Sequence, residues 1–484
     1  MIPTPALEIT VLVWGLFLLL AEAFAGKTDK RVWAIAGIAG LGVVLVGTFF
    51  LAPPPPIAAS GFWSFYTADP LAIFFKRFAL VTTIFVLVMA IDFSPSIRLG
   101  VPGAAPYAGL GEFFALPIFT CAGLMWMASA IDFVMIFVSL ELVTMSFYVL
   151  VAFTRRNPLS LEAGVKYLIL SALSTGFLVY GITWIFGVTG ETSLLRMSSA
   201  LATQPIDTVP LLFGIALVLV ALGFKIAAVP FQIWVPDVYQ GAPTPVTAFL
   251  SVGSKAAGFV VLLRVLEPFS VYPQVNHLLV GMAALTLIYG NFAALPQTNL
   301  KRLLGYSSIA HAGYLLVGVV CLAGEAVAFY LTSYLLMTLL CFAVMIVVAN
   351  HGGEEIEDYA GLAKRSPFLA GAMLVGMLSL AGIPFTAGFL GKFFIFDAAI
   401  RQRQILLVVI GVITVGCGFY YYLKVVRAMY WEEPAPDAAV IQVSGLSRAA
   451  IALLVAGIFI LGVYPQPILN ALQPTLPAAQ VRLR

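Results

Sequence analysis

The sequence predicts an all-α integral membrane protein, and its composition and the length of its apolar runs carry this prediction. Of its 484 residues, 62% are hydrophobic and 10% are charged, whereas a soluble domain is about half apolar and about a quarter charged. Apolar runs of about 20 residues, the length that crosses the hydrocarbon core as a helix, follow one another along the chain. The alternating pattern of a membrane β-barrel is absent from these runs.

About fourteen runs reach the length that a spanning helix needs. Clusters of proline, glycine and charge separate them, as at 53–56 and 155–158, and the weakest division falls at 130–131, where only Asp132 marks a turn. The expected spans are 6–25, 32–51, 71–92, 113–130, 131–153, 162–187, 208–229, 245–266, 276–295, 299–323, 325–350, 366–397, 404–430 and 447–470.

The distribution of basic residues predicts the orientation of the bundle. Loops after odd-numbered spans are richer in Lys and Arg, for example Arg155, Arg156, Lys364 and Arg365. Cytoplasmic loops carry this excess in membrane proteins, so both termini are expected on the outer side. No basic segment precedes the first apolar run, which therefore reads as an uncleaved first span.

Two spans carry matching proline interruptions, at 228–231 (Ala-Val-Pro-Phe) and at 382–385 (Gly-Ile-Pro-Phe). Proline removes a backbone donor and clashes with the preceding turn, so helix breaks are expected at Pro230 and Pro384. Paired broken helices in two halves of a chain are typical of transporters, although prolines that match by chance are the alternative.

The two breaks lie five spans apart, and an odd offset means that the second copy is inverted in the membrane. The predicted organisation is spans 1–3 in residues 1–112, a first inverted repeat of spans 4–8 in 113–267, a second of spans 9–13 in 268–431, and the last span with its tail in 432–484.

Ionisable side chains inside the apolar runs are the candidate functional residues. A charge at the bilayer centre costs roughly 2.5–3.5 kcal/mol on insertion scales, so such residues are rarely there without a role. Among the groups nearest mid-membrane only one is acidic, so they cannot all be closed into ion pairs, and burial disfavours the charged form of an unpaired amine. This property suits proton transfer. The candidates are Glu141, Lys166, Lys225, Lys255, His311 and Lys392.

Each candidate also has a structural interpretation. A buried charge can belong to a static ion pair, and a lysine near a span end can be a snorkelling anchor. The anchor interpretation is nearly as good for Lys166, and His311 can equally be a helix-packing histidine. Four further basic residues are expected to be anchors: Arg264, Lys301, Arg302 and Lys424.

Other site chemistries lack their motifs. The four cysteines are scattered without a CxxC, and the three histidines lie far apart, so no metal or iron–sulfur site is indicated. Neither a phosphate loop nor a dinucleotide fingerprint is present, so the chain is expected to bind no cofactor itself. A net charge of +3 gives no sign of a nucleic-acid partner.

The segment from Pro230 to Lys255, with the motifs at 234–237 (Trp-Val-Pro-Asp) and 241–245 (Gly-Ala-Pro-Thr-Pro), resembles the antiporter-like membrane subunits of respiratory complex I (NADH:quinone oxidoreductase). The same family includes subunits of multi-subunit sodium/proton antiporters. Span number, Glu141, both breaks and the loop at 357–362 extend the resemblance over the chain. Two features resemble the N type of these subunits, which is equivalent to mitochondrial subunit 2. The chain ends after the last span, and Lys392 stands where another type carries a glutamate.

The resemblance implies a non-redox, proton-translocating subunit that couples quinone reduction elsewhere in the complex to proton transfer. In the family pattern, Glu141 and Lys225 form a coupling pair and Lys255 is the central carrier. The resemblance also implies that Lys392 is the terminal group and that His311 is a relay between the lysines. It further implies that Lys166 tunes the first half.

The resemblance further implies a bacterial inner membrane location with periplasmic termini. The expected partners are other membrane-arm subunits, including a second antiporter-like subunit and small membrane subunits, together with lipids and no nucleic acid. NADH, FMN, iron–sulfur clusters and quinone are expected in other subunits or at their interfaces. Two alternatives stand beside this hypothesis: a subunit of a multi-subunit cation/proton antiporter, and a passive scaffold whose buried charges fix helix register.

Overall fold

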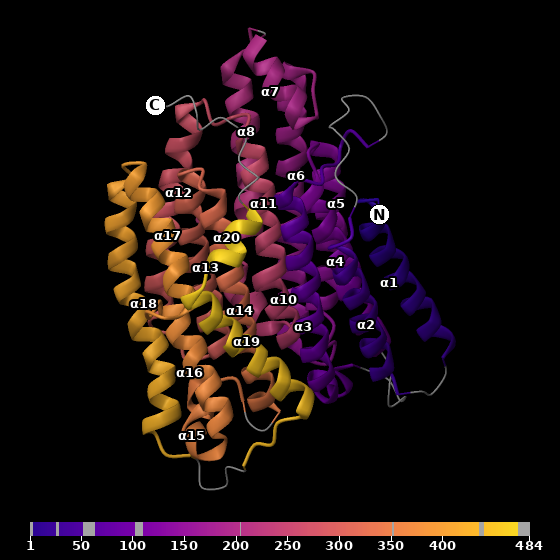
Figure 1. Cartoon of the computed structure of the whole chain (residues 1–484), viewed down its shortest axis with the longest axis vertical. Helices are drawn as coiled ribbons and strands as arrows, with labels where there is room; N and C mark the ends of the chain where they lie inside the picture. The colour runs from indigo at the N-terminus through magenta and orange to yellow at the C-terminus, as the bar shows by residue number, and fades with distance from the viewer. Residues whose placement is uncertain are drawn as a thin grey trace.

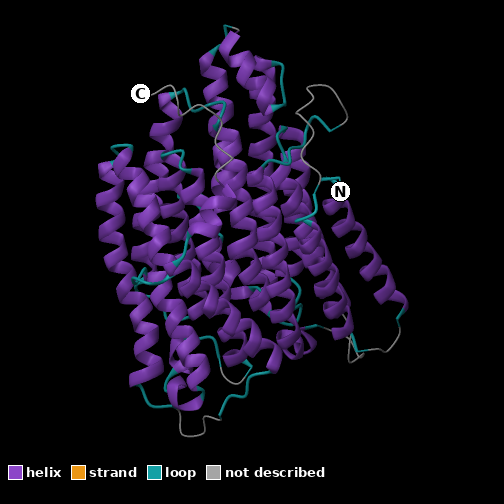
Figure 2. Ribbon diagram, viewed as in Figure 1, coloured by secondary structure: helices purple, strands orange, loops and turns teal. Residues whose placement is uncertain are grey.

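The computed structural model is a bundle of α-helices that describes residues 3–25, 29–51, 63–101, 110–203, 205–350, 353–434 and 440–472. Figure 2 shows helices joined by loops, with no strand in this described part of the chain. The proline run at 53–56, most of the tail after the last predicted span, from 473 onward, and His351 lie outside the described residues.

The first half of the bundle contains long helices and one short surface helix. Asp132 separates α4 from α5, because its carboxylate accepts a hydrogen bond from Val134 N at 2.8 Å and caps α5. The helices are α1 (Ala6–Phe24), α2 (Arg31–Gly47), α3 (Pro70–Gly100), α4 (Leu110–Ser129), α5 (Phe133–Val151), α6 (Pro158–Thr189), α7 (Leu194–Thr203) and α8 (Thr208–Ile226).

The second half contains the shorter, interrupted helices. They are α9 (Val235–Gly241), α10 (Thr244–Phe249), the π-helical turn η1 (Leu250–Ser254), α11 (Lys255–Leu266), α12 (Pro273–Ala294), α13 (Leu300–Val320) and α14 (Gly324–Ala349). After the 3₁₀ turn η2 (Ile356–Tyr359) come α15 (Leu362–Arg365), α16 (Pro367–Ala381), α17 (Ala387–Arg401), α18 (Ile405–Trp431), α19 (Gly445–Val463) and α20 (Gln466–Leu472).

The helices confirm the predicted fold class. Twelve spans of the described chain are long and apolar enough to cross a membrane, with α10, η1 and α11 forming one of them (Thr244–Leu266), and α2 and α16 are shorter apolar helices. The number of spans and the inverted repeat remain predictions.

The most buried helices occupy the middle of the bundle. The span of α13 is wholly buried, and that of Thr244–Leu266 is 94% buried. Helix α13 packs against α9, α12, α14 and α17. In Figure 1 it lies near α12, α14 and α17, while α1 and α18 form opposite edges. Side chains on α11 and α13 are therefore shielded from lipid, which gives the residues they carry a protected interior.

Candidate functional site

The first proline segment separates α8 from α9. Helix α8 ends at Ile226, and Ala227 takes a left-handed conformation with φ 64°. Two backbone groups at this break hydrogen-bond to side chains. Trp234 Nε1 donates to Phe224 O at 3.1 Å, and Val229 N donates to Thr286 Oγ1 at 2.9 Å. Without these bonds, the Phe224 carbonyl and the Val229 N–H would lie in the apolar interior without a hydrogen-bond partner from a side chain.

The second proline segment separates α16 from α17 in a similar way. Helix α16 ends before Gly382, whose φ of 91° favours glycine. Both ends share one pattern, because Ile383 N donates to Leu378 O as Ala228 N donates to Gly223 O. Such paired ends are helix-terminating Schellman motifs.

Lys392 binds the end of α16. Its Nζ donates to the carbonyls of Leu380 and Ala381, both at 2.9 Å, and its side chain is buried. The last carbonyls of a helix carry partial negative charge, so they stabilise the ammonium without a carboxylate. A change in the charge of Lys392 would therefore alter the helix end at the break.

Glu141 and Lys225 do not form a direct ion pair in the described part of the chain. Lys225 Nζ donates to Thr144 Oγ1 at 2.5 Å, and Thr175 Oγ1 donates to the Glu141 carboxylate at 2.7 Å. Ser174, Thr175 and Lys225 line one small cavity. Lys225 is buried, whereas Glu141 is half-buried.

Lys255 begins α11 directly after the π-helical turn η1. π-Helical turns occur frequently at functional sites. The Lys255 side chain is 2% exposed, and its Nζ donates to the Ser308 carbonyl and hydroxyl. Ser308 also hydrogen-bonds to Tyr239 at 3.1 Å, and the Tyr334 ring lies 5.6 Å from Nζ. No carboxylate pairs with Lys255 among the described residues.

His311 lies between the two buried lysines of the second half. Its Nδ1 is 2.7 Å from Tyr330 OH and its Nε2 is 3.0 Å from Tyr422 OH. Tyr422 also hydrogen-bonds to Ser307, the neighbour of the serine that binds Lys255. Lys255 and Lys392 are both close enough to act on a charge at His311. The hydroxyls and the imidazole thus form a polar connection through the apolar core.

A family model described as NADH:quinone oxidoreductase/Mrp antiporter, TM matches residues 130–418, which contain Lys255, Ser308, His311 and Lys392 but not Tyr422. The chain belongs to this antiporter family. It is 38% identical to NADH-quinone oxidoreductase subunit N of Moorella thermoacetica, an alignment that covers 96% of each protein.

Two solved structures extend the comparison across the antiporter family. Respiratory complex I from Thermus thermophilus with bound aureothin contains a chain that is 31% identical, with a TM-score of 0.80 and coverage of 96% of this protein and 98% of that chain. The Mrp complex from Dietzia sp. DQ12-45-1b contains a chain that is 22% identical, with a TM-score of 0.82 and coverage of 97% and 96%. The second likeness shows a shared fold.

Lys166 lies apart from the buried connection of this antiporter-family chain. Its side chain is 39% exposed, and its Nζ pairs with Glu162 at 2.7 Å and with Asp237 at 2.6 Å. Asp237 also binds Arg302 of α13 at 2.7 Å. One carboxylate therefore joins a lysine of the first predicted repeat to an arginine of the second.

The expectation that Lys301 and Arg264 are snorkelling anchors is wrong. Lys301 is 4% exposed and pairs with Glu354 at 2.7 Å, and its Nζ also donates to Ala242 O. Arg264 donates two hydrogen bonds to the Asp69 carboxylate, at 2.9 and 2.8 Å. A partly exposed carboxylate at the end of a helix or in a loop holds each cation, and apolar periodicity does not reveal such a partner. Of the other two, Arg302 binds Asp237, and Lys424 donates to Gln297 O.

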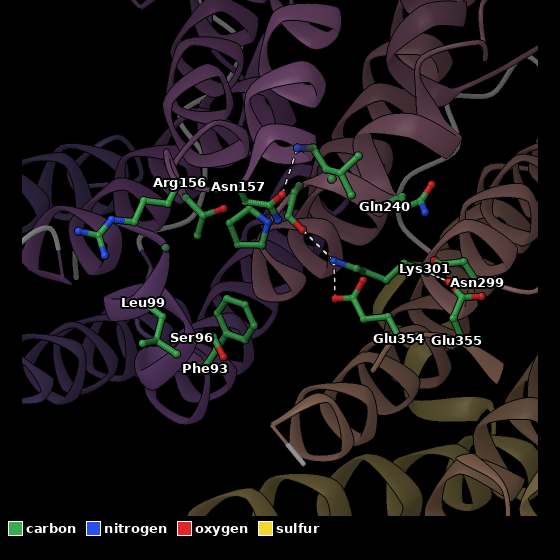
Figure 3. A pocket seen from close by; sticks show the side chains of 16 residues that line it. Phe93, Ser96, Leu99, Arg156, Asn157, Gln240, Asn299, Lys301, Glu354 and Glu355 are labelled. Atoms are coloured by element: carbon green, nitrogen blue, oxygen red, sulfur yellow. Dashed lines mark hydrogen bonds and ion pairs between the residues drawn. The ribbon is translucent and has the colours of Figure 1, made fainter. Parts of the chain in front are cut away.

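A pocket opens beside the junction of α9 and α10 (Figure 3). Its volume is about 560 Å³, and Gln240, Gly241 and Pro243 line it together with the Lys301–Glu354 pair. Figure 3 shows Lys301 between Glu354 and a backbone carbonyl. Tyr239, which reaches Ser308, directly precedes this lining segment.

Sequence reasoning missed the hydroxyl groups that connect the charged residues. Thr144 lies three residues after Glu141 on α5, and Ser307 lies four residues before His311 on α13. Residues three or four apart share a helix face, so a search for hydroxyls at this spacing would have found both. Tyr330 and Tyr422 come from distant helices, and only the tertiary fold brings them to His311.

Proposed function

We propose that this chain is the antiporter-like N-type subunit of the membrane arm of NADH:quinone oxidoreductase and translocates protons through its buried polar connection. The observation that carries the proposal is a pair of hydrogen-bonded sets that meet at neighbouring residues of α13. Lys255 binds Ser308, and Tyr422 binds both Ser307 and His311. Each group can both accept and donate a proton.

The second half works as a relay. A proton on Lys255 passes to the Ser308 hydroxyl as that hydroxyl gives its own proton onward, and His311 accepts on one ring nitrogen while it donates from the other. Because Lys255 and His311 have no carboxylate partner in the described part of the chain, a second positive charge nearby is repelled. This repulsion drives the proton away from an occupied carrier toward Lys392.

The first half supplies the switch. The Glu141 carboxylate stabilises a charge on Lys225, and Thr175 and Thr144 occupy the space between them. When Thr175 binds Glu141, the carboxylate is held away from direct contact. Rotation of either threonine would let the two charges approach each other, and the nearer carboxylate would strengthen the hold of Lys225 on its proton.

The pocket beside α9 and α10 is the proposed inner entrance. Tyr239 follows the pocket on the path to Lys255, since its hydroxyl binds Ser308. The Lys166–Asp237–Arg302 cluster at the same helix junction tunes the charge there.

The wider assignment follows from the same proposal. The chain is a multi-pass membrane protein, and we place it in a bacterial inner membrane with periplasmic termini. Segments 113–267 and 268–431 are the proposed inverted repeats, a proposal supported by the shared Schellman ends at their breaks. Redox groups and quinone belong to other subunits, and the partners are a second antiporter-like subunit, small membrane subunits and lipids.

Purification of the tagged chain in mild detergent tests this function. Co-purifying flavin and iron–sulfur subunits with NADH:quinone reductase activity are expected. If only membrane antiporter subunits co-purify and no NADH activity is found, the chain is instead part of a cation/proton antiporter. Lys225→Ala and Lys255→Ala in the purified complex then distinguish a proton-transfer role from a scaffold role. If the lysines only hold the helices in register, the variants lose stability and keep proton transport.

A further inference from the structure

A second buried cluster of ionisable groups joins α1 to α3, away from the connection described above. Glu8 of α1 and Lys76 of α3 are both fully buried, and Lys76 Nζ lies 2.7 Å from Glu8 Oε1. Tyr66 OH donates to the same oxygen at 3.0 Å and accepts from Lys76 Nζ at 2.5 Å. The three side chains, named the Glu8 cluster here, form a closed triangle.

The geometry of the Glu8 cluster leaves one acceptor unused. Both hydrogen bonds reach Oε1, whereas Glu8 Oε2 is buried and has no hydrogen-bond partner among the described residues. A buried charged acceptor without a partner is costly. A buried pair is also weak evidence for stability, because apolar residues of similar size often serve as well. A packing role therefore does not account for this arrangement.

The Glu8 cluster is mechanically tied to the helix that carries Lys255. Asp69 caps α3 by accepting from Ala72 N at 2.7 Å, and Arg264 of α11 donates to both of its oxygens. Arg264 follows Lys255 by nine residues on α11, which is about 13.5 Å along the helix axis. The pocket lies at the opposite end of the same span, beside Pro243.

We propose that the Glu8 cluster is a further proton-binding site whose exchange of protons with the outer side follows the charge of Lys255; this rests on the proposed proton-translocating function. A proton taken up from outer-side water forms an O–H bond on Glu8 Oε2, which converts carboxylate and ammonium into carboxylic acid and ammonium. Loss of that proton to outer-side water restores the pair. The titratable and charged groups that face Glu8 or its partner Lys76 are Tyr66, Asp69 and Arg264.

The Asp69–Arg264 bridge gives the site its link to the central carrier. A change in the charge of Lys255 that shifts α11 moves Arg264 and, through Asp69, the start of α3 where Lys76 lies. The positive charge that Glu8 feels from Lys76 changes with this movement, so proton uptake and release at Oε2 follow the state of Lys255.

The test uses Glu8→Gln/Lys76→Met in the purified complex reconstituted into proteoliposomes. This double variant removes the titratable groups together and leaves no unpaired charge, so a purely structural pair tolerates it. The expected result is normal assembly with proton translocation about tenfold slower, the effect of a barrier raised by about 1.4 kcal/mol. Glu22→Gln/Lys30→Met is the matched control, since it removes another ion pair of α1, at 2.6 Å.

Three outcomes decide between the possibilities. Translocation by the double variant equal to that of the control overturns this proposal. If Lys255→Met abolishes translocation in the same preparation, the proposed function still stands; if Lys255→Met translocates normally, the proposed function itself fails.

A milder variant keeps the proposal testable if the double variant does not assemble. Tyr66→Phe removes the hydroxyl that stabilises the Glu8 carboxylate, so a larger share of that carboxyl is protonated at a given pH. The infrared carbonyl band of a protonated carboxylic acid should be stronger in Tyr66→Phe than in the unmodified complex. An unchanged band overturns the proposal.

Discussion

Tyr422→Phe is the most informative single substitution in the buried connection. The Tyr422 hydroxyl is the only group in the described chain that hydrogen-bonds to both Ser307 and His311. The variant keeps the ring, which is 1% exposed, and so keeps the packing. It removes one hydroxyl and leaves His311 Nε2 without its partner.

The size of the effect follows from the broken contacts. A buried polar group that loses its partner costs about 1–3 kcal/mol, and an equal rise in the transfer barrier slows proton passage roughly 5- to 150-fold. NADH:quinone reductase activity and proton uptake by proteoliposomes should therefore fall together in Tyr422→Phe, while the complex remains assembled.

Tyr421→Phe is the matched control for this measurement. Tyr421 is also 1% exposed, and its hydroxyl donates to Asn291 Oδ1 at 3.1 Å, away from His311. Its loss should cost a similar amount of stability and leave translocation near normal. Equal translocation defects in the two variants, or normal translocation in Tyr422→Phe, would refute the relay through His311.

Three further predictions address other parts of the site. Gly382→Ala should reduce the stability of the fold by about 1 kcal/mol or more, because φ is 91° there and a residue with a Cβ would be strained. The melting temperature of the complex should therefore fall, and equal melting curves would contradict this. Glu141→Gln should slow proton translocation several-fold with quinone reduction, and proteoliposomes acidifying at the normal rate would argue against the switch. Burial raises the pKa of Asp69, but the Arg264 guanidinium, the Ala72 N–H and Lys76 together lower it more, so the folded pKa lies below its ordinary value. Asp69 therefore stabilises the fold above a pH of about 3.9 and loses this contribution as pH falls through the folded pKa; thermal melting of Asp69→Asn should be less dependent on acid pH.

The membrane fold was predictable because each spanning helix has its own apolar run, and proline acts locally at Pro230 and Pro384. The division at Asp132 was found for the same reason, since a single capping carboxylate fixes the start of α5. Helices too short or too polar to span alone, such as α7, carried no such signal.

The connections between charged residues were less predictable, because they depend on helices that are distant in the sequence. Glu141 and Lys225 were expected to form a coupling pair, but the sequence did not indicate that Thr175 binds Glu141 and Thr144 binds Lys225. Arg264 and Asp69 form an ion pair although they lie 195 residues apart in the sequence. A single sequence indicates how deep a charged residue lies in its span, but it does not indicate which residue of another helix binds it.

The central claim is that Lys255 carries protons for the complex, and proton translocation per NADH oxidised by Lys255→Met in proteoliposomes tests it most directly. Methionine retains the apolar stem, and no described residue offers Lys255 a carboxylate that the substitution would leave unpaired, so assembly should persist. The account predicts that proton translocation and coupled quinone reduction both fall at least about tenfold, a barrier change of about 1.4 kcal/mol. An assembled variant that oxidises NADH and translocates protons at the unmodified rate would contradict it.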